Sequence, residues 1–158
     1  MRIPNSFVTR FTQASDLKLA CVFYSLIHKN TKRNLLGYEI TVKQTTLVSL
    51  CGFSVSTVKR AASSLLKSGF IKSQKRQTNA PGKLGTYTYT IEAVSTASKY
   101  FTIDKKLMSR LNGNEFRVYA MCCKLADSSH KNFFQSYNDL SQLLGMSRQD
   151  VLRTIEKL

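Results

Sequence analysis

The chain has 158 residues, 42% hydrophobic and 21% charged, which is typical of a folded protein with one ordinary domain or two small ones. Lysine and arginine number 24 against 9 acidic residues, so the formal net charge is +15 at pH 7. No segment approaches the roughly 20 apolar residues of a membrane span, and the N-terminal sequence lacks a signal-peptide run. We therefore expect a cytoplasmic protein of the bacterial cytosol or nucleoid, with no membrane partner.

The sequence gives no sign of catalysis, a cofactor or a metal site. It contains no glycine-rich phosphate loop, no nucleophile next to a base, and no Cys-x-x-Cys or Cys/His spacing. His28 and His130 each follow a predicted helix in a polar loop. We interpret the four cysteines as reduced core residues and expect the protein not to be an enzyme. The cysteines are Cys21, Cys51, Cys122 and Cys123.

The positive charge is unevenly distributed. Residues 1–98 contain 14 cations and 3 anions, whereas residues 99–158 contain 10 cations and 6 anions. No acidic residue occurs between Glu39 and Glu92. A face that only keeps a protein soluble usually mixes both signs, so this run favours a polyanionic partner such as nucleic acid.

Hydrophobic periodicity predicts three helices in the first half. Residues 16–30 repeat apolar side chains in the period of an amphipathic helix. An extended piece, "YEITV", precedes a short helix "KQTTLVSLC" that Gly52 ends. Ser54 is placed to cap a helix over about 54–68, which Gly69 stops. The expected buried stripe of that helix is Val58, Ala61, Ala62, Leu65 and Leu66.

Two short helices joined by a tight glycine turn predict a helix-turn-helix, and its outward face is basic. Hydroxyls and cations on the first two turns of the second helix can reach phosphates and base edges when that helix enters a major groove. These residues are Ser56, Thr57, Lys59 and Arg60.

A basic hairpin is predicted directly after this helix, over about residues 70–92. "FIKSQKRQT" and "TYTYTIEA" both alternate in the strand period, and "NAPGKLG" between them supplies turn residues. The hairpin contains Lys72, Lys75, Arg76 and Lys83. A helix-turn-helix followed by such a hairpin resembles the winged-helix family over roughly residues 15–92. The resemblance implies a recognition helix in the major groove and a wing on the DNA backbone or minor groove.

The second half repeats the first. "DLKLACVFYSLIHKN" aligns with "EFRVYAMCCKLADSS" at an offset of 99, and "LVSLCGFSVSTVKRAASSL" aligns with "LSQLLGMSRQDVLRTIEKL" at an offset of 93. We therefore expect unit 1 over residues 1–95 and unit 2 over residues 96–158, with a linker near 93–103. Unit 2 ends at Leu158 without a wing, so we expect a truncated second unit.

The recognition helix of unit 2 is expected to start near Ser147, its cap. Arg148, Gln149 and Arg153 face outward, and Gln and Arg side chains can pair with adenine and guanine edges. Asp150 would repel phosphates, but it also suits the first turn of a helix. Direct DNA contact by unit 2 therefore stays open against packing or dimerisation.

The sequence thus predicts a mainly α protein with a small β-hairpin wing (α+β), built as two tandem winged-helix units. This arrangement resembles the DNA-binding regions of plasmid and phage replication initiators. The resemblance implies double-stranded DNA with repeated or two-part sites as partner. A transcription regulator, an accessory factor for DNA transfer, a protein-interaction module and a homodimer remain alternatives.

Overall fold

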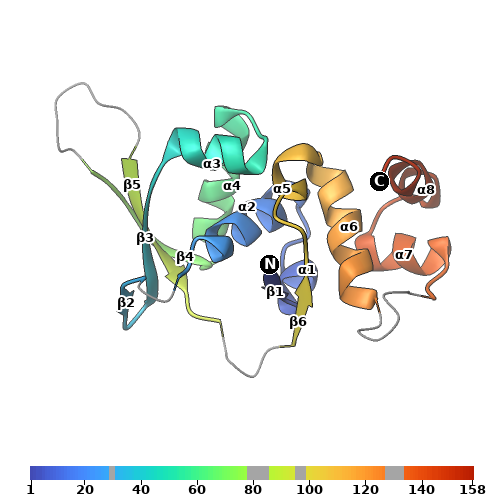
Figure 1. The fold of residues 1–158 in the computed structure, drawn as a ribbon, viewed down its shortest axis with the longest axis horizontal. Helices are drawn as coiled ribbons and strands as arrows, with labels where there is room; N and C mark the ends of the chain where they lie inside the picture. The colour runs from blue at the N-terminus through green and yellow to red at the C-terminus, as the bar shows by residue number, and fades with distance from the viewer. Residues whose placement is uncertain (29–30, 78–85, 95–98, 127–133) are drawn as a thin grey trace.

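The computed structural model describes residues 1–28, 31–77, 86–94, 99–126 and 134–158. Within these ranges it has eight helices and two small antiparallel sheets, so the predicted α+β class is confirmed (Figure 1). No helix of the described ranges is both long and apolar enough to cross a membrane.

A four-stranded antiparallel sheet lies at one end of the molecule, in the order β2-β3-β5-β4. The strands β4 (Ile71–Arg76) and β5 (Thr86–Glu92) form the predicted hairpin, whose tip at residues 78–85 lies outside the described residues. The extended piece is β3 (Gly37–Lys43), which pairs along its whole length with β5 and joins the two-residue β2 (Arg33–Asn34). The hairpin is therefore part of a larger sheet, in which β4 is an edge strand.

The three predicted helices form in the first half; two follow the sequence pattern closely, whereas the first begins two residues before the predicted periodic stretch and ends at Ser25. The three are α2 (Ala14–Ser25), α3 (Gln44–Cys51) and α4 (Val55–Lys67). Gly52 ends α3 in the left-handed conformation, with φ of 63°, and the Ser54 side chain caps α4. The prediction that Leu66 belongs to the buried stripe is wrong, since this side chain is 42% exposed. It follows the buried Leu65 by one residue along the helix and therefore points away from the core.

Helix α2 differs from the expected amphipathic helix because it is buried on all sides. Every residue from Asp16 to Phe23 is buried, including a lysine, Lys18. Helix α4 packs on one side of α2, and α6 (Gly113–Leu125) packs on another. A helix enclosed in this way has no side that faces solvent. The apolar period in its sequence therefore indicates only one of the helices against which it packs.

Three helices of the second half fall at the positions in the sequence where the two offsets place them. Helices α6, α7 (Tyr137–Leu144) and α8 (Arg148–Ile155) occupy the positions that the two sequence offsets assign to the counterparts of α2, α3 and α4. Gly145, the counterpart of Gly52, has φ of 59° and ends α7 in the same way. No strand follows α8 within the described residues.

Two segments for which the sequence predicts no helix or strand form both in the structure. Strand β1 (Arg2–Pro4) pairs with β6 (Tyr100–Thr102), which lies inside the expected linker. Short helices follow each strand, α1 (Ser6–Arg10) and α5 (Leu107–Arg110). The buried side chains of both repeats belong to one hydrophobic cluster. Figure 1 shows the sheet at one end, α7 and α8 at the other, and α2 and α6 between them.

The two turn glycines offer a matched stability test. A Cβ at Gly52 would lie 2.2 Å from the Ser109 carbonyl oxygen, whereas a Cβ at Gly145 would meet nothing within 4 Å. We expect Gly145→Ala to cost about 1–2 kcal/mol, the strain of a left-handed alanine. Gly52→Ala should cost roughly 1–3 kcal/mol more, because the backbone must also shift. Urea unfolding of both variants measures the difference, and equal losses would contradict the close approach.

Candidate nucleic-acid interface

The start of α4 is organised around the Ser54 hydroxyl. Its Oγ accepts a hydrogen bond from the Thr57 backbone N–H at 3.2 Å and lies 2.9 Å from both the Ser56 Oγ and the Thr57 Oγ1. The two hydroxyls that were expected to face DNA are therefore held in one cluster. Each hydroxyl oxygen keeps lone pairs that can accept a further hydrogen bond.

The cations of α4 are exposed and have no acidic partner within the part of the chain that the structure describes. Lys59 and Arg60 are both exposed, and the ion pairs among the described residues are Arg10–Glu92 at 2.8 Å and Lys32–Glu39 at 3.2 Å. The first turn of α4 contains no acidic residue. The positive end of the helix dipole and the two side-chain charges therefore act in the same region without compensation.

The register of the hairpin separates the predicted wing cations. Directly opposed residues of an antiparallel pair project to the same face. Arg76 is opposite Tyr87 and Gln74 is opposite Tyr89, whereas Lys75 is opposite Thr88 on the other face. Arg76 therefore shares a face with the tyrosines.

A groove between α4 and this face of the sheet has a volume of about 210 Å³. Lys59 and Ser63 of α4 line it together with Gln74 and Tyr87 of the sheet. Sequence reasoning missed Ser63, Gln74 and Tyr87 as members of this surface. The strand register, which pairs polar β4 residues with tyrosines, could have indicated Gln74 and Tyr87, and helical spacing from Lys59 could have indicated Ser63.

Three of the predicted wing cations lie elsewhere or are not described. Lys72 is the extra residue of a β-bulge, and its Nζ lies 3.8 Å from the place of a Cβ on Gly69, beyond the C-terminal end of α4. Lys75 is on the opposite sheet face, where it helps to hold the pKa of Glu39 below its usual value, after Asn34 and Lys32. Lys83 lies outside the described residues.

In the second repeat, α8 presents the three predicted side chains Arg148, Gln149 and Arg153, all exposed. Asp150 is part of the helix cap, because the Ser147 hydroxyl donates to its carboxylate at 2.6 Å and accepts from its backbone N–H at 3.1 Å. Capping of its own helix therefore accounts for an acidic residue at this position.

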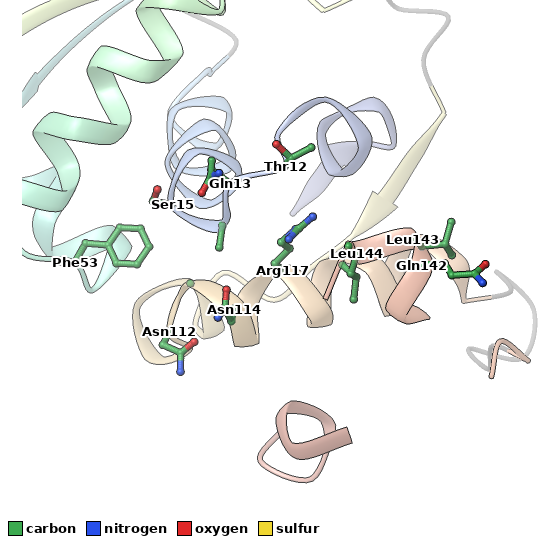
Figure 2. A pocket seen from close by; sticks show the side chains of 13 residues that line it. Thr12, Gln13, Ser15, Phe53, Asn112, Asn114, Arg117, Gln142, Leu143 and Leu144 are labelled. Carbon is green, nitrogen blue, oxygen red and sulfur yellow. The ribbon is translucent and has the colours of Figure 1, made fainter. Parts of the chain in front are cut away.

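Helices α4 and α8 lie on opposite sides of the central pair α2 and α6 (Figure 1). A groove of about 740 Å³ runs between the repeats, where the first turns of α2 and α6 meet the end of α7. Figure 2 shows Gln13 and Ser15 on the α2 side, with Asn114 and Arg117 on the α6 side. The Arg117 Nε is buried and has no hydrogen-bond partner among the described residues, and burial lowers the pKa of this guanidinium. The sequence could not indicate this groove, because it depends on how the repeats pack.

Histidine, cysteine and acidic side chains are the groups that a metal site or a reactive thiol would require. No three His, Cys, Asp or Glu side chains in the described ranges gather in a way that could hold a metal ion. All four cysteines are free thiols, and burial raises the pKa of Cys51 to about 12 and that of Cys122 to about 11. His28 is exposed in a loop, as expected, and His130 lies outside the described residues.

No protein-family model, curated protein or solved structure matches the chain.

The hydroxyl cluster at the start of α4 can be tested by substitution. Ser54→Ala removes the acceptor of the Thr57 N–H, so we expect a loss of about 1 kcal/mol in the free energy of unfolding. Ser63→Ala, on the exposed face of the same helix, is the matched control and should change stability by less than about 0.5 kcal/mol. Urea unfolding compares the two; similar values would contradict the capping role.

Proposed function

We propose that the protein binds double-stranded DNA in a sequence-specific manner through two tandem winged-helix-type units. One observation is the main support: a helix, a left-handed glycine turn and a serine-capped helix occur twice at matching positions. Lys59 and Arg60, the exposed cations in the first two turns of α4, have no ion-pair partner among the described residues. That combination suits a polyanion whose grooves accept a helix.

In this proposal α4 enters the major groove by its first two turns. Arg60 makes the bidentate contact with a guanine edge, and the hydroxyls of Ser56 and Thr57 accept from base amino groups. Lys59 and Arg76 neutralise phosphates on either side of the groove between α4 and the sheet, which releases counterions and provides most of the affinity.

The second unit extends the contact along the duplex. Arg148, Gln149 and Arg153 of α8 have the side chains to read a second element. Because both units belong to one core, the second contact is intramolecular and needs a target element at a fixed distance. Such two-part or repeated sites are the targets of plasmid and phage replication initiators. We therefore propose origin binding for a mobile element as the biological role.

Selection from a pool of random duplexes tests this proposal. We expect enrichment of a site with two conserved elements at a constant spacing, and a binding constant that falls steeply with salt. Enrichment of one short element alone would limit the reading to one unit. Failure to retain any duplex at low salt would contradict the proposed function.

Variants of the first unit separate base reading from phosphate binding. Arg60→Gln should cost about 1–3 kcal/mol on the selected site and relax the preference at one base pair. Arg76→Gln should weaken binding to all duplexes alike and reduce the log–log salt slope by about 1.

Lys75→Gln is the matched control for these variants. It removes the same charge from the opposite face of the sheet, so its effect on affinity should be well below that of Arg76→Gln. If all three variants scale affinity equally on every sequence, the assigned roles are wrong.

A further inference from the structure

Lys18 is a fully buried lysine in the middle of the molecule, with an exposed fraction of 0%. Its Nζ donates a hydrogen bond to the Leu111 carbonyl oxygen. The same ammonium lies 4.5 Å from the ring centroid of Phe53 and 5.8 Å from that of Phe116. The side chain thus contacts three different segments besides its own helix.

These segments belong to the two repeats. Phe53 lies in the turn between α3 and α4, whereas Leu111 directly precedes Asn112, the cap of α6. A Cβ on Gly113 would lie 3.2 Å from the Ala14 Cβ and 3.7 Å from the Phe53 ring, so the repeats approach closely around Lys18. Lys18 therefore bridges the turn of the first repeat and the start of the second.

The charged surroundings of Lys18 do not compensate its burial. Burial lowers the pKa of Lys18 to about 8, and Cys51 on α3 and Glu115 on α6 only partly oppose this. The pKa of the Cys51 thiol is itself raised to about 12, so the thiol is neutral at pH 7. The carboxylate of Asp16, on the same helix, accepts hydrogen bonds from the hydroxyls of Ser15 and Ser64.

The direction of this shift shows what the ammonium does to stability. The pKa is lower in the folded protein than its ordinary value of 10.5, so folding disfavours the charged form. Lys18 therefore reduces the free energy of unfolding by its full penalty below pH 8, and this penalty diminishes as the pH increases from about 8 to 10.5. An apolar side chain of similar length would avoid this penalty.

A buried charge that lowers stability can still specify one arrangement. The ammonium has to reach a single carbonyl oxygen, whereas apolar side chains tolerate several packings. We propose that Lys18 is a positioning residue that fixes the second helix-turn-helix unit against the turn of the first, and so sets the spacing of a two-part DNA site. This inference rests on the proposed function for its DNA consequence, but not for the positioning itself.

The positioning is tested without DNA in Lys18→Met. We expect the difference in unfolding free energy between Lys18→Met and wild type to narrow as the pH rises from about 8 to 10, because only the wild type loses the penalty of a buried ammonium in this range. Residual dipolar couplings should fit one alignment tensor for all helices of the wild type, but require a second, weaker tensor for α6, α7 and α8 in the variant. Lys99→Met, at an exposed lysine, is the control and should keep the wild-type behaviour. A single tensor in Lys18→Met would overturn the proposal.

The consequence for DNA is tested with the selected two-part site. Inserting about 5 base pairs, half a helical turn, between its elements should weaken wild-type binding at least tenfold. Lys18→Met should lose less than threefold on the same insertion, with unchanged affinity for a duplex that holds one element. Equal losses in both proteins would overturn the role in spacing.

A second variant protects the test against misfolding. Lys18→Gln keeps a hydrogen-bond donor for the Leu111 carbonyl but has no charge, so it should lose the pH dependence and keep the single tensor. Two tensors in Lys18→Gln would contradict positioning through this hydrogen bond. If wild type binds no duplex, the proposed function fails, while the dipolar couplings still decide the positioning.

Discussion

The packing of α2 against α6 is the contact on which the rest of the structure depends. These two helices are the first long helices of the two repeats, and each also packs against the helix that follows the glycine turn of its own repeat, α4 or α8. Because α2 receives α4 and α6 on different sides, it is buried throughout its middle and tolerates no solvent face. The same contact buries Lys18 and forces the first turn of α6 close to the turn after α3. One helix pair thus determines both the core and the relation of the repeats.

Because both repeats share one core, the molecule differs from a pair of modules joined by a flexible linker. The expected linker contains β6, which pairs with β1 near the start of the chain, so this part of the connection belongs to the folded structure. Rigidly joined units restrict the targets that both can bind at once, and this restriction favours sites of defined spacing. The proposed DNA binding therefore depends on core packing as much as on the surface cations.

Local signals in the sequence were sufficient for the elements of each repeat. Gly52, Ser54 and the stripe from Val58 to Leu65 predict the turn and its second helix, because caps and periodicity are properties of neighbouring residues. The same signals could not place Lys18 inside the protein, assign Arg76 and Lys75 to opposite faces, or find the groove at Arg117. Those features depend on tertiary packing and strand register. Leu66 shows the limit within a helix, where an apolar residue at the margin of the stripe is exposed.

Backbone amide chemical shifts during titration with duplex DNA test the central claim most directly. If both units bind DNA, the largest changes should fall in the first two turns of α4, in β4 near Arg76, and at the start of α8. The account predicts small changes in α1 and in the β2–β3 turn, on surfaces that belong to neither recognition helix. Changes concentrated in those control regions, or no saturable change at low salt, would contradict DNA binding through tandem helix-turn-helix units.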